Sequence, residues 1–461
     1  MTAHLGLIGL GAMGRNLGWR LAELAIQTAV YSYDAQEITR FAAGLPTPPL
    51  AATDPIDLVR QLERPRAVLT MVTAGEAVDR VIDDLLPALE AGDVVIDGGN
   101  SHFRDTIRRG VKLRKQGIGY IGAGISGGEA GARHGASIMV GADREDYDVV
   151  RPVLEALAAR FDDSVCAARV GPDGAGHFVK MVHNGIEYAL MQLIAETWRT
   201  MTHVLGWDRQ QQQDAFAHFE EGPAASYLVG ITVDILGTPD PEGDGYLVDR
   251  ISDRAAQKGT GRWTVEAALE LGVPVPAIAA AVNERMISAG SRRDRGRRAG
   301  TRPAPTSIRV DTLERALVAG FVSTFAQGFT LLDAAGKAYD WSLDLAEIAR
   351  IWQGGCIIRA AMLRDVEAAL RANPGVESML SADVFRRGLA EGEQDWREMV
   401  ACNVSAGTTA PCASAALAWY DSLSGGTLPT NLIQAQRDYF GAHGFERTDR
   451  QGRFQATWKK S

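Results

Sequence analysis

The hydrophobic residues of this chain follow two different patterns. In the first part, short apolar runs alternate with longer amphipathic stretches, and these runs predict strands at residues 28–33, 66–72, 94–97 and 120–122. A further apolar run, HLGLIG, precedes all of them. Strands that alternate with helices form parallel sheets, so this part of the chain predicts a doubly wound α/β fold.

From about Gly174 onward the strand signals fade. Long segments with helical periodicity dominate instead, as at residues 311–341 and 343–371. A chain of 461 residues is long enough for more than one domain. We therefore expect an α/β domain over residues 1–173, a large all-helical domain over 174–425 and a C-terminal tail over 426–461.

Three glycines follow the first predicted strand. Gly9, Gly11 and Gly14 form a full G-x-G-x-x-G pattern between that strand and an amphipathic helix. Such glycines permit a tight turn, and they let backbone N–H groups approach a pyrophosphate at the helix N-terminus. The position between strand and helix predicts a Rossmann-type domain that binds a dinucleotide.

Two polar, glycine-rich stretches follow later strands. DGGNSHFRDT (97–106) and GAGISGGEAGARHGAS (122–137) are expected to be loops at the carboxyl ends of those strands, where ligands bind in open α/β sheets. Asn100 and Ser126 are able to hydrogen-bond a small polar ligand. Two such loops side by side favour a substrate site over a pair of plain connections.

The stretch KMVHNGIEYA (180–189) predicts a buried helix that carries groups able to move protons. Residues three, four, seven and eight apart share a helix face, and one face here carries Lys180, His183, Asn184, Glu187 and Tyr188. The remaining surface is apolar, as core packing requires. Any one of these polar groups fits a buried structural network, but five on one face favour catalysis.

Lys180 is the candidate general base. Oxidising a secondary alcohol by hydride transfer needs a base for the hydroxyl proton, and burial without a facing carboxylate lowers the pKa of a lysine below its usual value of about 10.4. If the oxidised carbon lies β to a carboxylate, the 3-keto acid loses CO2 without a metal, and the enediol then needs a proton at carbon. Glu187, two turns further along, is the expected acid, while His183 and Asn184 position the substrate.

Six motifs resemble decarboxylating 6-phosphogluconate dehydrogenase in their order and separation. They are GLGAMG, DGGNSHFRDT, GISGGEAGARHG, KMVHNGIEY, QKGTGRWT and LIQAQRDYFGAH. The match runs from about residue 5 to about residue 447. The resemblance implies oxidative decarboxylation of 6-phospho-D-gluconate to D-ribulose 5-phosphate and CO2 with reduction of a nicotinamide cofactor, in the pentose phosphate pathway and gluconate utilization.

The resemblance further implies which residues hold the substrate, and it gives Glu187 the same role as acid. Residues at the carboxylate and hydroxyls would be Asn100, Ser126, Gly127, Gly128, His183 and Asn184. Residues at the phosphate would be Tyr188, Lys258, Thr260 and Arg285, with Arg437 and His443 from the tail of a second subunit. The resemblance therefore implies a homodimer with shared active sites.

The resemblance and the glycine turn together give a set of residues for the nicotinamide cofactor. The set is Gly9, Leu10, Gly11, Ala12, Met13, Gly14, Ser32, Tyr33, Asp34, Val72, Thr73, Ala74 and Asn100. Thr73 stands where relatives usually have a lysine beside the nicotinamide. This departure leaves room for a change in how the substrate is handled.

A second departure concerns the choice between NAD and NADP. NADP-using members of the family carry Asn, Arg and Thr where this chain has Ser32, Tyr33 and Asp34. Asp34 lies twenty residues after Gly14, the spacing of an acid that binds the ribose 2′-hydroxyl of NAD, and it would repel a 2′-phosphate. We therefore predict a preference for NAD, or at least weakened use of NADP, with Arg40 as a compensating charge nearby.

Charge and composition disfavour several other classes of protein. The net charge of −9 disfavours nucleic acid as a partner, and the basic run SRRDRGRRAGTR (291–302) has no aromatic residues between its arginines. We find no apolar run of membrane-spanning length and no basic leader, so we expect a cytoplasmic protein without a membrane partner. Zinc-ligand spacing is absent, so we expect no metal and reduced, buried thiols at Cys166, Cys356, Cys402 and Cys412.

Two alternatives remain open from the sequence. A sister reaction on another anionic sugar acid, such as a 6-sulfo sugar acid, or on a simple 3-hydroxy acid uses the same chemistry, although Lys258, Arg285 and Arg437 argue against the simple acid. A cofactor-binding protein without turnover keeps only the fold, and Lys180 and Glu187 argue against it.

Overall fold

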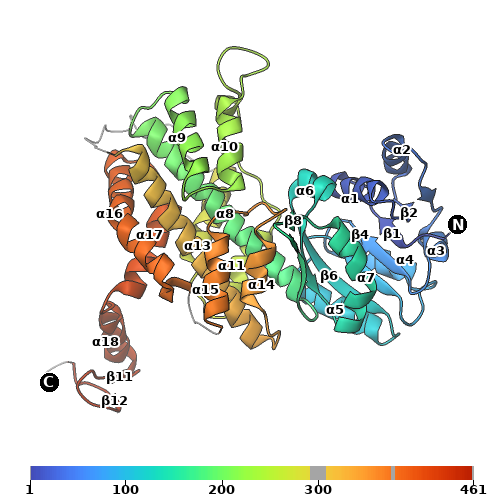
Figure 1. Cartoon of the computed structure of the whole chain (residues 1–461). Coiled ribbons are helices and arrows are strands. Elements are labelled where there is room, and N and C mark those ends of the chain that lie inside the picture. Colours follow the sequence, from blue (N-terminus) through green and yellow to red (C-terminus); the bar gives the residue numbers. More distant parts are fainter. Residues whose placement is uncertain (1, 291–307, 375–378, 459–461) are drawn as a thin grey trace.

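The computed structural model describes residues 2–290, 308–374 and 379–458. An α/β unit forms one end of the molecule, a helical body forms the other, and a slender tail leaves the helical body (Figure 1). The predicted order of a Rossmann-type domain followed by a large helical region is confirmed. The basic run at 291–302, which was considered as a contact for nucleic acid, lies outside the described residues.

Within the described residues, eight strands form one sheet, in the order β10-β7-β6-β5-β4-β1-β2-β3. Their bounds are β1 (Leu5–Ile8), β2 (Thr28–Tyr31), β3 (Leu50–Ala51), β4 (Ala67–Thr70), β5 (Val94–Asp97), β6 (Gly119–Ser126), β7 (Ser137–Gly141) and β10 (Ala167–Gly171). Strands β1 to β6 are parallel, but β7 is antiparallel to β6, and β10 runs parallel to β7. The doubly wound prediction therefore holds, except that one edge of the sheet is antiparallel.

Alternate residues of the central strands face opposite sides of the sheet. In β5, Val94 and Ile96 pack into one core with residues of several helices, and Val95 packs into another core on the other face. Because both faces are covered, these strands are buried along their whole length and read as continuous apolar runs. The helices around the sheet are α1 (Ala12–Glu23), α2 (Ala35–Ala43), α3 (Pro55–Arg60), α4 (Glu76–Leu85), α5 (Phe103–Arg114), α6 (Gly128–His134) and α7 (Arg144–Leu157). A short hairpin, β8 (Arg160–Phe161) and β9 (Ser164–Val165), precedes β10.

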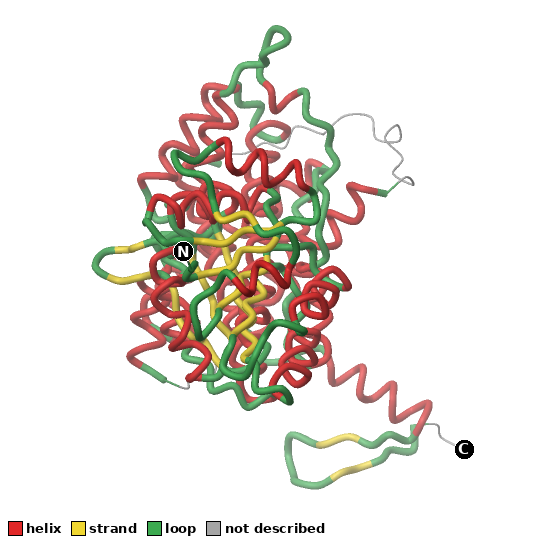
Figure 2. The backbone as a smooth tube through the Cα atoms, turned by 90° about the vertical axis from the view of Figure 1, so that its right-hand side faces the viewer, coloured by secondary structure: helices red, strands yellow, loops and turns green. Residues whose placement is uncertain are grey.

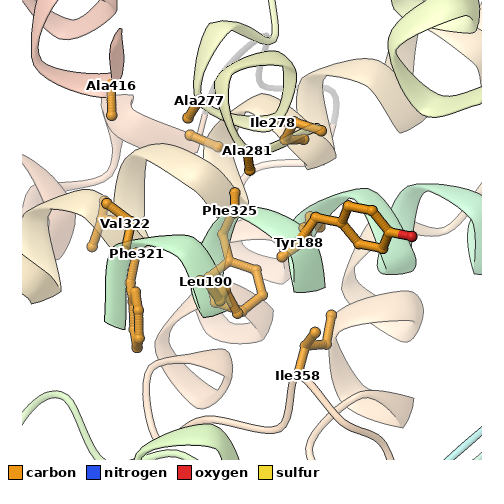
Figure 3. Close-up of a cluster of buried hydrophobic side chains, with 14 of the residues drawn as sticks. Tyr188, Leu190, Ala277, Ile278, Ala281, Phe321, Val322, Phe325, Ile358 and Ala416 are labelled. Atoms are coloured by element: carbon orange, nitrogen blue, oxygen red, sulfur yellow. The ribbon is translucent and has the colours of Figure 1, made fainter. Parts of the chain in front are cut away.

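The helical body is built around one long helix, α8 (Ala175–His203). Its other helices are α9 (Arg209–Glu221), α10 (Tyr227–Gly237), α11 (Thr260–Glu270), α12 (Pro276–Ala289), α13 (Val310–Ala338), α14 (Leu345–Ile351), α15 (Leu363–Ala372), α16 (Asp383–Ala406) and α17 (Pro411–Ser424). Helix α8 contacts α11, α12 and α13, and its N-terminal half lies against β6 and β7. Figure 3 shows the resulting core, with Leu190 of α8 beside Phe325 of α13 and Ile278 of α12 nearby.

Close contact between glycines joins α8 to the sheet. A Cβ atom on Gly176 would lie 2.2 Å from the carbonyl oxygen of Gly122, and a Cβ atom on Gly124 would lie 2.4 Å from the Cβ of Lys180. Only glycine leaves room for a helix this near to a strand. The first turns of α8 are thereby fixed directly beneath β6.

Two details of the helical region differ from the sequence prediction. The segment 343–371 is not one helix, because residues 352–362, which connect α14 to α15, are not helical. Helix α13 is also long and apolar enough to span a membrane by composition, which contradicts the expectation for apolar runs. It is a core helix, however, since 83% of its most apolar window is buried inside the molecule, where it packs against α8 and α16.

The C-terminal tail extends away from the helical body in both views (Figures 1 and 2). It consists of α18 (Thr430–Gly441) and a hairpin of β11 (Phe445–Glu446) and β12 (Arg453–Phe454). Leu432, Ile433 and Phe440 on α18 are 63%, 55% and 74% exposed. All four cysteines are free and buried, as predicted.

Candidate active site

The glycine-rich turn between β1 and α1 forms a cradle for an anion. Gly9 has a φ of +92°, which favours glycine, and a Cβ on Gly14 would lie 2.0 Å from the Gly9 carbonyl oxygen. Gly11 instead faces open space, since a Cβ there would approach Glu37 Oε1 only to 3.9 Å. Helix α1 begins at Ala12 with neither a side-chain cap nor an acidic residue in its first turn. Its N–H groups therefore suit a pyrophosphate, and the turn fits a dinucleotide.

The other predicted cofactor residues lie at the carboxyl ends of neighbouring strands. Leu10 lies in the glycine-rich turn and is buried, and Met13 lies in the first turn of α1 and is partly buried. Val72 and Ala74 follow β4 and are partly buried, and Thr73 between them is exposed. The sheet order places β4 beside both β1 and β5, so these turns are neighbours at one edge.

The end of β2 carries two carboxylates rather than a cationic pocket. Asp34 caps α2 by accepting from the Gln36 N–H at 2.9 Å, and it pairs with Arg40 at 3.3 Å. The Ser32 hydroxyl donates to Glu37 Oε2 at 2.6 Å. Sequence reasoning named Ser32, Asp34 and Arg40 but missed Glu37. An acid in the first turn of the helix after the second strand is the signal that reveals it.

Tyr33, the remaining residue predicted here, points elsewhere. Its hydroxyl donates to Asp84 on α4, and its ring packs edge-on against Tyr31. Half of the Tyr33 side chain is exposed. It therefore forms part of the rim beside Asp34 rather than an anion contact.

Lys180 lies on the face of α8 that packs against β6 and is only 6% exposed. Burial lowers the pKa of its amine, as expected. The expectation that no carboxylate faces Lys180 is wrong, because the charge of Glu187 acts on it and raises the pKa. Burial is the larger influence, so the net shift favours a neutral amine.

His183 connects α8 to the end of β6. Its Nε2 lies 3.0 Å from Ser126 Oγ, and its Nδ1 lies 3.1 Å from Asn184 Oδ1. Its ring packs edge-on against Trp352, with centroids 5.6 Å apart. Burial holds the pKa of His183 well below its usual value, so the ring is neutral and exchanges hydrogen bonds without charge.

Glu187 lies one turn beyond His183 on the same side of α8. Its Oε2 lies 3.8 Å from His183 Nδ1. Burial raises the pKa of Glu187, although the charges of Lys180 and Arg285 oppose the shift. The carboxyl group is therefore better able to hold a proton than an exposed glutamate, and it can act as an acid.

Tyr188 directly follows Glu187 on α8, and with Arg285, Thr260 and Lys258 it makes up the predicted phosphate residues, called here the cationic cluster. The Arg285 guanidinium of α12 lies 3.7 Å from the centre of the Tyr188 ring, and its Nη1 donates to the Ala256 carbonyl at 3.2 Å. Thr260, the first residue of α11, is buried, and a Cβ on the next residue, Gly261, would lie 2.7 Å from the Tyr188 ring. Figure 3 shows the Tyr188 hydroxyl pointing away from the apolar core. Lys258 is exposed in the loop just before α11.

The glycines that follow β6 permit a close approach of the segment around Gly355. Gly127 has a φ of +138°, and a Cβ there would lie 2.4 Å from the Gly355 carbonyl oxygen. The segment around Gly355, which sequence reasoning missed, thus packs against the predicted substrate residues. Gly128 and Asn100 are both exposed, one at the start of α6 and the other between β5 and α5.

Two of the sequence predictions about this region need correction. The stretch 122–137 is not a loop throughout, because β6 continues to Ser126 and α6 begins at Gly128. The stretch 97–106 is likewise a loop only in part, because α5 begins at Phe103. The predicted buried helix at 180–189 is present within α8, where almost every residue is buried. Within the described residues of one chain, Arg437 and His443 do not join the others: both are exposed on the tail, where Arg437 Nη1 donates to Gln434 Oε1 at 3.0 Å.

Two family models match this chain. The NAD binding domain of 6-phosphogluconate dehydrogenase matches residues 4–171, and the C-terminal domain of 6-phosphogluconate dehydrogenase matches residues 176–458. The NADP(+)-dependent, decarboxylating 6-phosphogluconate dehydrogenase of Bacillus subtilis is 42% identical over 466 residues, covering 99% of each chain. The decarboxylating enzyme of Escherichia coli is 42% identical with the same coverage. The solved 6-phosphogluconate dehydrogenase of Plasmodium falciparum superposes with a TM-score of 0.93 at 36% identity, covering 99% of this chain and 100% of that one.

Proposed function

Because the chain belongs to the 6-phosphogluconate dehydrogenase family, we propose that Lys180 and Glu187 carry out the two proton transfers of the decarboxylating reaction. The reaction itself is the oxidative decarboxylation of 6-phosphogluconate with NAD(P), a step of the pentose phosphate pathway. The observation that best supports the assignment is the burial of Lys180 on the same helix face as Glu187.

Lys180 acts first. A nicotinamide cofactor held at the turn of Gly9, Gly11 and Gly14 would supply the acceptor for the hydride that leaves the substrate carbon β to the carboxylate. The neutral Lys180 amine takes the hydroxyl proton from the same carbon, so that a ketone forms. The bond to the carboxylate then breaks and CO2 leaves. The electron pair of the broken bond forms a carbon–carbon double bond, and the carbonyl pair moves onto the ketone oxygen. The Lys180 ammonium then returns its proton to that oxygen to give an enediol.

Glu187 completes the reaction by protonating the carbon that has lost CO2, while the Lys180 amine, neutral again, takes back the enediol hydroxyl proton so that the ketone forms. An acid is required at this step. Burial raises the pKa of Glu187, which favours its protonated form. The hydrogen bond between Ser126 and His183 holds both side chains at one wall. We assign these two residues, with Asn184, Asn100, Gly127 and Gly128, to the carboxylate and hydroxyls of the substrate.

The phosphate of the substrate would lie at the cationic cluster. Tyr188 directly follows Glu187 on α8 and contacts Arg285, while Thr260 begins α11 and Lys258 lies in the loop before it. An anionic group held there would be the end of the substrate far from Lys180. Charge-assisted hydrogen bonds to arginine contribute roughly 1.5 to 3 kcal/mol each. We further propose that Arg437 and His443 reach this cluster from the tail of a second copy.

Incubating the purified protein with 6-phosphogluconate and either NAD or NADP tests the proposed reaction. We expect one CO2 for each nicotinamide reduced, because loss of CO2 follows oxidation without a separate cofactor. Absorbance of reduced nicotinamide and trapped CO2 are measured in the same sample. Reduction without gas would contradict decarboxylation. Parallel assays with 6-sulfogluconate and with a simple 3-hydroxy acid compare the two alternative substrates.

We propose that the enzyme prefers NAD to NADP. The 2′-phosphate of NADP would lie near the end of β2, where Asp34 and Glu37 supply two carboxylates and Arg40 is already paired with Asp34. At the exposure of this site the repulsion is partly screened by solvent. The relative in Bacillus subtilis is named as NADP(+)-dependent, so the preference would be a property of this chain rather than of the family.

Cofactor selectivity is measured as kcat/KM with each cofactor. We expect the value for NAD to exceed that for NADP by about tenfold, the effect of roughly 1.4 kcal/mol of repulsion. The double substitution Asp34→Asn, Glu37→Gln should raise kcat/KM for NADP by about tenfold. Glu145→Gln, which removes an exposed acid from α7, is the matched control and should leave the ratio unchanged. A strong NADP preference of the unaltered enzyme would defeat the proposal.

Three further expectations from the sequence remain predictions. They are the division at residues 173 and 425, the homodimer and the cytoplasmic site of action. The boundary at 173 falls between the end of β10 at Gly171 and the start of α8 at Ala175. The compartment is not uniform among relatives, since one from Oryza sativa is named as chloroplastic.

A further inference from the structure

We propose that Arg109 positions the nicotinamide end of the cofactor by holding together the two loops that follow β4 and β5. Arg109 lies on α5 and is 1% exposed. A buried guanidinium requires partners for its N–H groups. Its partners come from both loops, which are defined here as residues 71–75 after β4 and 98–102 after β5. The inference rests on the proposed assignment of these loops to the cofactor.

On the side of the β4 loop, Arg109 makes three hydrogen bonds. Its Nη2 donates to the Gly75 carbonyl at 2.9 Å. Its Nε and Nη2 donate to the two carboxylate oxygens of Asp79, in the first turn of α4, at 3.1 and 2.9 Å. A planar fork that meets a carboxylate in this way is fixed in direction as well as in distance. The end of the loop that carries Val72, Thr73 and Ala74 is thereby held.

On the side of the β5 loop, the contacts run through Asp97. Arg109 Nη1 lies 3.5 Å from Asp97 Oδ2 and 3.4 Å from Ser101 Oγ. Asp97 is buried, accepts from the Gly99 N–H at 3.1 Å, and accepts from Ser101 Oγ and the Tyr120 hydroxyl at 2.6 and 2.9 Å. The residues on both sides of Asn100, Gly99 through its N–H and Ser101 through its hydroxyl, are therefore hydrogen-bonded to the carboxylate that Arg109 neutralises.

The two loops also touch each other. Strands β4 and β5 are neighbours, with Thr70 opposite Asp97, and a Cβ on Gly99 would lie 3.1 Å from the Val72 carbonyl oxygen. The Asp97 carbonyl in turn lies 3.1 Å from Nε2 of His177, three residues before Lys180 on α8. One guanidinium thus sets the spacing between the β4 loop, Asn100 and the helix of the proposed base.

The variant Arg109→Lys tests this role because it keeps a positive charge beside Asp97 but cannot make the fork to Asp79 and Gly75. We expect kcat to fall and KM for the cofactor to rise, each by about tenfold, while KM for 6-phosphogluconate changes by less than about threefold. Affinity for ADP-ribose, which lacks the nicotinamide, should stay within about twofold. Asp79→Asn should shift kcat and cofactor KM in the same direction by about threefold.

Arg108→Met is the matched control. Arg108 is the preceding residue, it pairs with the same Asp79 at 3.0 Å, and its side chain is largely exposed. Its replacement should leave kcat and both KM values within about twofold. Unchanged kcat and cofactor KM in Arg109→Lys would overturn the proposal, and so would a parallel loss of ADP-ribose affinity, which indicates general disorder of the domain. If Arg109→Lys does not fold, Asp79→Asn decides by the same comparison. An unaltered protein that lacks activity would instead refute the proposed function.

Discussion

Replacing Lys180 with methionine should lower kcat by at least about a thousandfold, because no other group on the described face of α8 is a neutral amine able to take the hydroxyl proton. Methionine has nearly the length of the lysine stem and no charge. The lysine side chain is buried, only 6% exposed, and packs against β6, so methionine would fill the same space. The fold and the affinity for the cofactor should therefore remain close to those of the unaltered enzyme. Single-turnover reduction of the cofactor and equilibrium binding of NAD measure the two properties separately.

Lys337→Met is the matched control for this experiment. Lys337 lies on α13, where its exposed amine pairs with Asp333 at 2.6 Å. Its loss should not affect kcat.

The pH profile gives a second readout: kcat/KM of the unaltered enzyme should fall at low pH as Lys180 gains a proton, with a midpoint below the usual pKa of lysine. Full activity in Lys180→Met would remove the proposed base.

The central strands could be predicted because burial on both faces leaves a direct mark on the sequence. β4 and β5 are continuous apolar runs, and the glycine turn after β1 has a fixed spacing. The end of β6 could not be predicted in the same way. Gly122 and Gly124 read as loop residues, but they are glycines because α8 lies against them too closely for a side chain. The cause is a helix that begins some fifty residues later, and no local pattern contains it.

Adjacent residues of like charge show a second limit of prediction from the sequence. Arg108 and Arg109 look equivalent in the sequence, yet Arg108 is largely exposed and Arg109 is fully buried. Their difference depends on Asp97 and Gly75, which come from other strands and loops. For α8, sequence periodicity did bring Lys180, His183 and Glu187 together. It placed them correctly because the helix itself sets their spacing.

The proposed contribution of the tail of a second copy to the phosphate site predicts a large effect on activity. Arg437→Ala should lower kcat/KM for 6-phosphogluconate by about a hundredfold if two charge-assisted hydrogen bonds are lost. The apolar side chains of Leu432, Ile433 and Phe440 on the same helix are largely exposed, as expected for a surface that another subunit covers. Arg450→Ala, an exposed arginine of the same tail, should change kcat/KM by less than about twofold.

Mixed dimers distinguish a tail that acts on its own subunit from one that acts on its partner. Lys180→Met and Arg437→Ala each damage both sites of a symmetric dimer. In a dimer of one Lys180→Met subunit and one Arg437→Ala subunit, exchanged tails would pair an intact Lys180 with an intact Arg437 at one site and leave the other site doubly damaged.

Purified mixed dimers, obtained by coexpression with two different tags, should therefore recover about half of the kcat/KM of the unaltered enzyme. Recovery is expected only if the tail crosses to the partner, because a tail that serves its own subunit leaves each site with one of the two defects. Truncation after Ser424 should abolish activity while leaving NAD bound to the α/β domain. A monomer that is fully active at assay dilution, or mixed dimers no more active than either parent, would refute shared sites.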